Sequence, residues 1–328
     1  MDVDLLVVGG GPAGAAAALT ARRLGMTVLV CESAGGARFR PGETLAPGTV
    51  ALLAGLVGGD CMRTLPGAAH EGIVVHAPDG TRLHRYGGAT TGRHLFRAEL
   101  DAALLGAAEC QGAIVARACP VSAVAIDADG VTVTGRGMQA RGCMVLDCSG
   151  GARWLSRQLA IPMLPLSRPL AVAYGYSATP HQDAPCFHID AAGWHWAADL
   201  GRGERVDCRM RFDGMRSAGP RHADATWTIA AELAGPAFLL AGDAACRVDP
   251  AASHGVLRAL VSGIQAAESA AAHLRQPSGA ALLHYCRRQV RWFLADCDRL
   301  DRHYRHLARL ADPVGFQARR LPLFGSSL

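Results

Sequence analysis

Residues 3–32 read VDLLVVGGGPAGAAAALTARRLGMTVLVCE, and this stretch decides the fold. An apolar run of strand length leads into a G-x-G-x-x-G turn, then an alanine-rich helical pattern, a second apolar run and a terminal acid, Glu32. This order predicts a βαβ unit that binds a dinucleotide at the turn. The alternative is a glycine turn without a ligand.

The residues of the turn have distinct predicted roles. Gly9 makes the tight turn, Gly11 lets backbone N–H groups approach a diphosphate at the helix N-terminus, and Gly14 lets helix and strand pack closely. Pro12 and Ala13 belong to the same predicted site. Glu32 follows at the spacing, about 20 residues, from which an acid accepts hydrogen bonds from ribose hydroxyls. This acid disfavours a 2′-phosphate but does not distinguish NAD from FAD.

Composition narrows the class of protein. The chain has 328 residues, 50% of them hydrophobic, which suffices for one large domain or two interleaved ones. The formal net charge is +5, but no long basic run points to nucleic acid. All 33 Lys and Arg residues are arginine, which excludes chemistry that requires a lysine. No stretch reaches membrane-spanning length without a charge.

The cysteines favour a reduced, cytoplasmic protein. They number 11, show no C-x-x-C motif and lie mostly in apolar runs. Cys143 and Cys148 have an odd offset, so a strand would point them to opposite faces and not form a dithiol pair. We also expect no signal peptide, because the first apolar run has an acidic flank and continues into glycines.

Five further segments resemble one superfamily. They are RFRPGETLAPG (38–48), HLFRAELDAALL (94–105), VLDCSGG (145–151), GWHWAADL (193–200) and GDAACRVDPAASHGVLRALVSGIQAA (242–267). Together with the N-terminal unit they look like the FAD-dependent monooxygenases that include aromatic hydroxylases and flavin-dependent halogenases. GETLAP and DPAASHGV look most like the subgroup that hydroxylates a tryptophan while maturing tryptophylquinone enzymes. The resemblance spans nearly the whole chain.

The resemblance implies an α/β fold in which an FAD-binding Rossmann-like fold is interleaved with a β-sheet substrate domain and followed by C-terminal helices. The FAD-binding domain would comprise residues 1–76, 97–162 and 232–276. The substrate layer would comprise residues 77–96 and 163–231, and its strands follow the alternation of residues 170–212. Residues 277–328 would form the helical segment.

The resemblance also assigns residues to the cofactor. A strand ending at Leu240 would deliver Gly242 and Asp243, whose carboxylate accepts from the ribityl hydroxyls of FAD. Pro250 would end a turn, and a helix beginning near Ala252 to Gly255 would aim its N–H groups at the flavin pyrimidine edge, with Gly255 and Val256 close to the cofactor. The alternative is a helix start that only packs well.

Other assignments come with open alternatives. Arg97 would line the flavin, or be a solvated arginine in a first helical turn. Arg40 and Glu43 would belong to a strap beside the isoalloxazine, or to a surface loop. Asp147 lies where a strand returns to the cofactor. The following Cys148 and Ser149 replace the Ala–Asp–Gly of hydroxylases that bind NADPH, which puts direct reduction by NAD(P)H in doubt.

Two tryptophans and one long helix complete the pattern. Trp194 and Trp196 share a strand face and would either flank the flavin or pack in the core, whereas His195 points the other way. Residues 280–309 have helical periodicity and would cover the substrate entrance, bind a partner or simply pack.

The function implied is that of an FAD-dependent oxidoreductase, foremost a monooxygenase that hydroxylates an aromatic ring through a flavin C4a-hydroperoxide. The ring could be a small molecule or a peptide-, protein- or carrier-bound tryptophan. Electrons would come from NAD(P)H or a separate flavin reductase, and His254 and Glu43 would steer protons. The alternatives are a reductase of the geranylgeranyl-reductase type and a flavin-bearing assembly partner without turnover. Halogenases of this group use a lysine, which the chain lacks, so halogenation is not expected.

Overall fold

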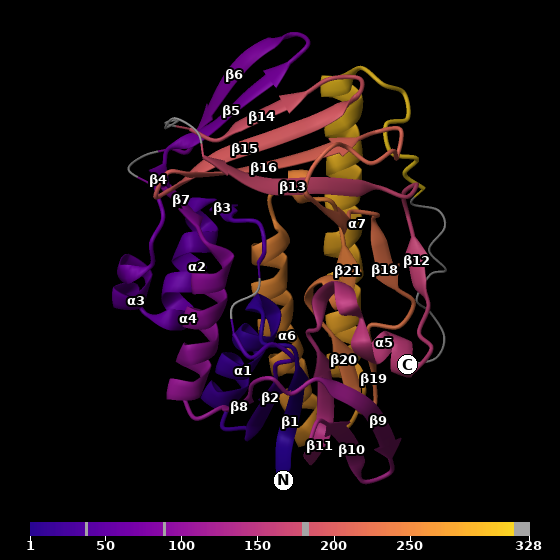
Figure 1. Cartoon of the computed structure of the whole chain (residues 1–328). Coiled ribbons are helices and arrows are strands. Elements are labelled where there is room, and N and C mark those ends of the chain that lie inside the picture. Colours follow the sequence, from indigo (N-terminus) through magenta and orange to yellow (C-terminus); the bar gives the residue numbers. More distant parts are fainter. Residues whose placement is uncertain (37–38, 88–89, 179–183, 318–328) are drawn as a thin grey trace.

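The computed structural model describes residues 1–36, 39–87, 90–178 and 184–317 (Figure 1). Arg38 of the strap motif and residues 318–328 of the predicted C-terminal segment lie outside the described ranges. Two large β-sheets organise the molecule, one at each end, and long helices run between them (Figure 1).

The first sheet has eight strands and a parallel centre. Its main path runs β19 (Ala234–Gly235), β20 (Phe238–Leu240), β11 (Met138–Asp147), β1 (Asp2–Val8), β2 (Val28–Cys31) and β8 (Ile114–Ala116). The hairpin of β9 (Val121–Asp127) and β10 (Gly130–Gly135) joins β11 antiparallel. β1 pairs in parallel with both β2 and β11, so the buried first strand lies inside the sheet.

The second sheet has seven strands, in the order β17 (Arg221–Asp224), β13 (Ala171–Ala178), β16 (Glu204–Arg211), β15 (Gly193–Gly201), β14 (Cys186–Ile189), β5 (Gly72–Ala77) and β6 (Gly80–Arg85). Two three-stranded sheets lie beside the large ones. One contains β3 (Glu43–Leu45), β7 (Gly92–Leu95) and β4 (Ala69–His70), and the other β12 (Met163–Pro165), β18 (Thr228–Ala230) and β21 (Cys246–Arg247).

Seven α-helices lie in the described ranges: α1 (Pro12–Arg23), α2 (Pro47–Val57), α3 (Gly59–Thr64), α4 (Arg97–Cys110), α5 (Trp154–Gln158), α6 (Gly255–Arg275) and α7 (Ala280–Ala308). Three short 3-10 turns accompany them: η1 (Gly150–Ala152), η2 (Gly242–Ala244) and η3 (Pro250–Ala252). In Figure 1, α7 runs alongside α6 and extends from the first sheet to the second.

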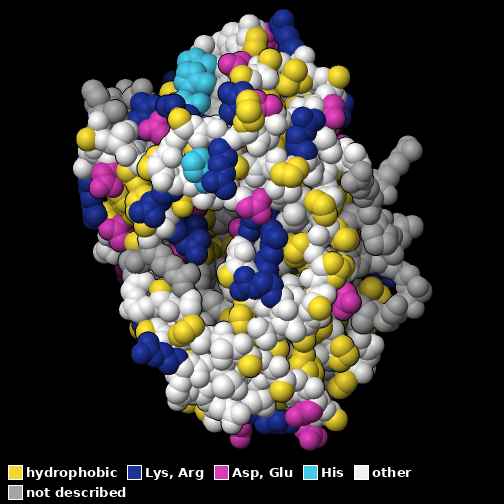
Figure 2. All heavy atoms as spheres, turned by 45° about the vertical axis from the view of Figure 1, so that its right-hand side comes forward, with side chains coloured by type: hydrophobic (Ala, Val, Ile, Leu, Met, Phe, Trp, Pro, Cys, Tyr) yellow, Lys and Arg dark blue, Asp and Glu magenta, His cyan; other side chains and the backbone are white. Residues whose placement is uncertain are grey.

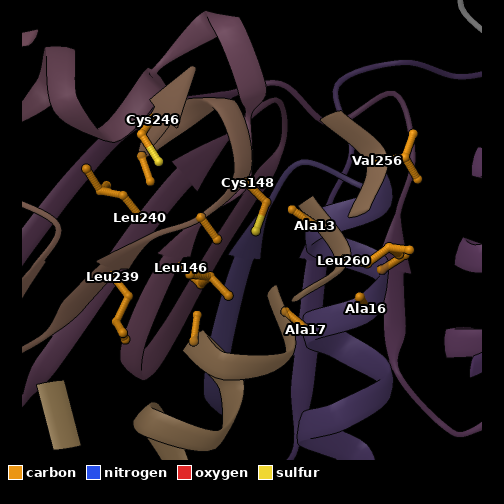
Figure 3. Close-up of a cluster of buried hydrophobic side chains, with 14 of the residues drawn as sticks. Ala13, Ala16, Ala17, Leu146, Cys148, Leu239, Leu240, Cys246, Val256 and Leu260 are labelled. Atoms are coloured by element: carbon orange, nitrogen blue, oxygen red, sulfur yellow. The ribbon is translucent and has the colours of Figure 1, made fainter. Parts of the chain in front are cut away.

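Small residues bring α1 and α6 into close contact. A Cβ atom on Gly263 would lie 2.1 Å from the carbonyl oxygen of Ala13. Figure 3 shows Ala13, Ala16 and Ala17 of α1 beside Val256 and Leu260 of α6. The alanine-rich helix therefore serves close packing at the point where the N-terminal turn and residues 242–256 must converge.

The predicted fold class is confirmed. β1, α1 and β2 form the βαβ unit, β13, β15 and β16 occupy residues 170–212, and α7 fills the predicted C-terminal helix. The division into domains remains a proposal; β5 already pairs within the second sheet. Each of the 11 cysteines is a free thiol, with Cys143 exposed and Cys148 buried. No helix in the described ranges is long and apolar enough to cross a membrane.

Candidate functional site

A cavity of about 750 Å³ joins the predicted cofactor segments to the inner face of the second sheet. On the face shown in Figure 2 the surface is hollowed near its centre, with arginine side chains on either side. Five arginines line the cavity: Arg40, Arg97, Arg157, Arg247 and Arg258. Such a lining suits a dianionic diphosphate.

The three glycines of the N-terminal turn differ in their surroundings as predicted. A Cβ atom on Gly14 would lie 1.9 Å from the carbonyl oxygen of Gly9, so only glycine fits there. Gly9 itself has a φ of +104°, which glycine adopts without strain. A Cβ atom on Gly11 would meet nothing within 4 Å, and Gly11 lines the cavity with Pro12 and Ala13. The turn is therefore open on the side where a diphosphate would lie.

Glu32 lies at the cavity wall directly after β2. Its Oε2 accepts a hydrogen bond from the N–H of Gly10 at 2.7 Å, and its Oε1 accepts from the N–H of Ala34 at 2.7 Å. These bonds fix the carboxylate between the glycine turn and the following loop. A carboxylate offers acceptor oxygens only, which is the chemistry that ribose hydroxyls require of a partner.

Asp243 lies in η2, after β20, and its side chain is 53% exposed. It lines the cavity with Gly242, and its Oδ2 is 3.7 Å from Nε of Arg247. Asp147 has a different position: it is fully buried and accepts from the N–H groups of Ser149 and Leu155. Asp147 thus shapes the loop that follows β11 and does not face the cavity.

The strap carries a partly buried charge cluster. The carboxylate of Glu43 lines the cavity and accepts from Nη1 of Arg97 at 2.8 Å, while Arg97 also pairs with Asp101 at 3.2 Å. Burial raises the pKa of Glu43, although the neighbouring Arg97 opposes this. Arg97 is therefore a cavity residue held between two carboxylates, and not a solvated first-turn arginine.

Contacts with the second sheet hold the strap in place. The Tyr176 hydroxyl donates to the carbonyl oxygen of Arg40 at 2.8 Å. The ring of Phe39 lies 5.2 Å from that of Tyr176, and the Arg221 guanidinium lies 4.0 Å from the Phe39 ring centre. The strap is thus attached to β13 at the edge of the cavity.

The inner face of the second sheet supplies an aromatic wall. Trp194 and Trp196 share a strand face, as predicted, and both line the cavity together with Phe187 and Tyr174. The rings of Phe187 and Trp194 are 5.8 Å apart. His195 points to the opposite face, where its Nε2 lies 2.8 Å from Oδ1 of Asp207. The chamber beside the cofactor segments is therefore aromatic and apolar.

Residues 249–256 form another wall of the cavity. Asp249, Pro250, Gly255 and Val256 line it, but His254 does not. The His254 ring is directed to α7, where its Nδ1 lies 2.9 Å from Nη2 of Arg299. This position does not support the predicted proton-steering role of His254. Of the predicted cofactor residues in the N-terminal turn, Gly14 does not line the cavity either; it serves the close packing described above.

Sequence reasoning missed several polar residues of the site, among them Asp249 and Arg247. Asp249 is 1% exposed and accepts hydrogen bonds from Trp227 and Tyr304. Arg247 lines the cavity and pairs with Asp224 at 2.7 Å. The V-D-P sequence before the helix was the available signal for Asp249, whereas its partners are distant in the chain. In the described ranges, no cluster of His, Cys, Asp or Glu is arranged to hold a metal ion.

Comparisons with known proteins agree with this geometry. No family model matches the chain. It is 26% identical to the flavin-dependent halogenase armH1 of Armillaria mellea, over 84% of this chain and 66% of that protein. The chain thus spans a little under two thirds of this relative's length.

Two solved structures show the same fold. The flavin-dependent halogenase CmlS superposes with a TM-score of 0.80 at 21% identity, over 90% of this chain and 63% of that one. The peptidyl tryptophan dihydroxylase QhpG, essential for tryptophylquinone cofactor biogenesis, superposes with a TM-score of 0.77 at 22% identity. The superposition covers 95% of this chain and 77% of that one. The chain therefore shares its fold with flavin-dependent halogenases and with QhpG, and a further structure with this fold, the halogenase PltM, is solved in complex with FAD.

Proposed function

We propose that the protein is an FAD-dependent oxidoreductase, and specifically a monooxygenase that oxygenates an electron-rich aromatic ring. One observation carries the proposal: a single cavity unites the dinucleotide turn with a chamber walled by Trp194, Trp196, Phe187 and Tyr174. An aromatic wall favours an aromatic substrate, because ring pairs add to the stabilisation gained by burial. The likeness to QhpG supports an indole as the ring.

The protein's share of the reaction is binding and positioning. Bound FAD, when reduced, would supply the oxygen-activating chemistry, and the chain would hold cofactor and substrate side by side in the cavity. Gly11 and Glu32 would bind the diphosphate and the adenosine ribose, and Asp243 would hold the ribityl chain. The strap and residues 250–256 would enclose the ring system. Electrons would come from a separate flavin reductase, the partner that suits a chain without the NADPH-associated motif.

Glu43 is the candidate for a proton step. Oxygenation of an aromatic carbon must be followed by loss of its proton, and a carboxylate at the cavity wall can accept it. Burial raises the pKa of Glu43 and so increases its basicity. Its bond to Arg97 fixes the side chain near the chamber.

Halogenation is the second candidate, and the relatives armH1 and CmlS favour it. The absence of lysine from the chain argues against it. An arginine cannot replace the lysine, because its guanidinium stays protonated and is a poor nucleophile.

Mass spectrometry distinguishes the two reactions. FAD-loaded protein is supplied with NADH, a flavin reductase, ¹⁸O₂, bromide and tryptophan-containing peptides. We expect a product that carries labelled oxygen and no bromine. Trp196→Ala should reduce turnover at least tenfold, whereas His195→Ala, on the other face of the same strand, should not. An enzyme-dependent bromine isotope doublet would contradict the proposal, as would FAD-loaded protein that consumes no oxygen.

A further inference from the structure

Asp249 connects the cavity wall to two elements outside the cofactor site. Its Oδ1 accepts from the Tyr304 hydroxyl at 2.7 Å and from the N–H of Ala251 at 3.0 Å. Its Oδ2 accepts from the indole N–H of Trp227 at 2.8 Å. Both aromatic residues are fully buried. With all three donors committed to it, this carboxylate is a fixed attachment point for η3 and not a group that exchanges protons with a substrate.

α7 holds the following residues as well. Nη2 of Arg299 lies 2.9 Å from Nδ1 of His254, the residue just before α6. One turn further along, Nη1 of Arg258 donates to Oδ2 of Asp296 at 2.6 Å. Asp249, His254 and Arg258 follow one another toward the C-terminus, and their partners Tyr304, Arg299 and Asp296 follow one another toward the N-terminus of α7. The two segments are therefore antiparallel and joined by three polar contacts.

Residues 249–255 depend on contacts from outside the segment, which come from Trp227 and from α7. η3 is only three residues long, and Ser253 has a φ of +54°, a backbone conformation that is unfavourable for residues other than glycine. A short turn with a strained residue keeps one conformation only if its surroundings determine it. α7 supplies part of those surroundings through Tyr304 and Arg299, and the indole of Trp227 supplies another part.

We propose that Tyr304 is a positioning residue for the flavin: through Asp249 it fixes residues 249–255, and with them the N-terminus of α6, against the ring system of FAD. The N-terminal N–H groups of α6 would stabilise negative charge on a reduced ring bound there, and such an effect falls off steeply with distance. The inference rests on FAD binding in this cavity and not on the identity of the substrate.

Tyr304→Phe tests the proposal because it removes one hydroxyl and keeps the ring. We expect FAD to bind about tenfold more weakly, in line with the loss of one hydrogen bond to a charged group. We also expect a shifted flavin absorption maximum and a more negative midpoint potential. These readouts need no turnover, so they remain informative if the proposed reaction is wrong.

Gln289→Met is the matched control. Gln289 is equally buried on α7 and bonds to Gln265 of α6 at 2.8 Å, but neither residue lines the cavity. This variant should lose a similar amount of stability and keep the FAD affinity, spectrum and potential of the parent. If Tyr304→Phe changes these three no more than Gln289→Met does, the proposal is wrong.

Two further measurements keep the test decisive. Tyr304→Phe combined with Asp249→Asn should weaken FAD binding no more than the worse single variant, since the Tyr304 hydroxyl acts through Asp249; additive losses would contradict the route through Asp249. If Tyr304→Phe does not fold, Arg299→Gln replaces it, with Arg302→Gln as its control on the same helix. Arg299→Gln should weaken FAD binding severalfold and Arg302→Gln should not; equal effects would overturn the proposal.

Discussion

Asp243 is the residue whose loss we expect to weaken cofactor binding most directly. It is half exposed at the cavity wall, so a ribityl hydroxyl can reach its carboxylate. A hydrogen bond to a charged group contributes roughly 1.5–3 kcal/mol, so Asp243→Ala should weaken FAD binding about ten- to a hundredfold. Titration followed by flavin fluorescence measures this. Asp207→Ala, on the outer face of the second sheet, should bind FAD normally. Unchanged affinity in Asp243→Ala would show that η2 only packs.

Asp249 makes stability depend on pH. Burial raises its pKa from 3.8 to about 6. As the pH rises from 4 to 6, the unfolded chain releases this proton before the folded one does, so stability falls across that window. Above pH 6, ionisation of Asp249 lowers the free energy of unfolding by on the order of 3 kcal/mol relative to pH values below 4.

Asp249→Asn cannot ionise and should lack this loss. Urea unfolding of the parent protein and of Asp249→Asn from pH 4 to pH 7 measures the difference between their free energies of unfolding. We expect this difference to change in favour of the variant as the pH rises. A difference that stays constant with pH would mean that Asp249 has the same pKa in the folded and unfolded chains.

At the scale of elements, the turn before α1 separates binding from folding. Gly11→Val places its side chain in open cavity space, so the variant should fold normally and fail to bind FAD. Gly14→Ala places a methyl group against the Gly9 carbonyl and should destabilise the protein by about 1–3 kcal/mol or more. Thermal unfolding without FAD, followed by FAD titration, checks both. Normal FAD binding by Gly11→Val would place the diphosphate elsewhere.

The attachment of α6 to α7 depends on a buried ion pair. Arg258 and Asp296 are 6% and 2% exposed, and the guanidinium also lies 5.0 Å from the Trp292 ring centre. Asp296→Ala leaves Arg258 buried without its carboxylate partner, which should cost about 3–5 kcal/mol of unfolding free energy. Asp298→Ala removes an exposed partner on the same helix and should cost under about 1 kcal/mol. Chemical denaturation measures both losses of unfolding free energy. Equal losses in Asp296→Ala and Asp298→Ala would contradict a stabilising role of the buried ion pair.

Elements with local signals were predictable from the sequence. The βαβ unit, the acid after β2 and the shared face of Trp194 and Trp196 all follow from short periodicities and spacings. Each of these features depends on the backbone geometry of only a few consecutive residues. Tertiary packing rarely overrides patterns that are this regular.

Features that depend on long-range contacts were not predictable. Asp249 meets Trp227 and Tyr304 across 22 and 55 residues of sequence, and no local pattern encodes that meeting. His254 was assigned to the flavin because it precedes a helix near the cofactor. The direction of its side chain is set by Arg299 on α7, which only the folded chain brings near.

The whole molecule is organised around one cavity shared by two sheets. The first sheet and its helices provide the dinucleotide turn and residues 242–256, and the second provides the aromatic wall. A cofactor and a substrate held in one enclosed space react as if at very high concentration. The central claim is therefore that the FAD ring system lies between the strap and residues 250–256, facing Trp194 and Trp196.

A crystal structure of the FAD complex tests that claim most directly. The diphosphate should lie at Gly11 and the α1 N-terminus, with the adenosine ribose at Glu32 and the ribityl chain at Asp243. The isoalloxazine should lie with one edge toward the start of α6 and its reactive side open to the aromatic chamber. An isoalloxazine bound outside this cavity, or separated from Trp194 and Trp196 by the protein chain, would contradict the account.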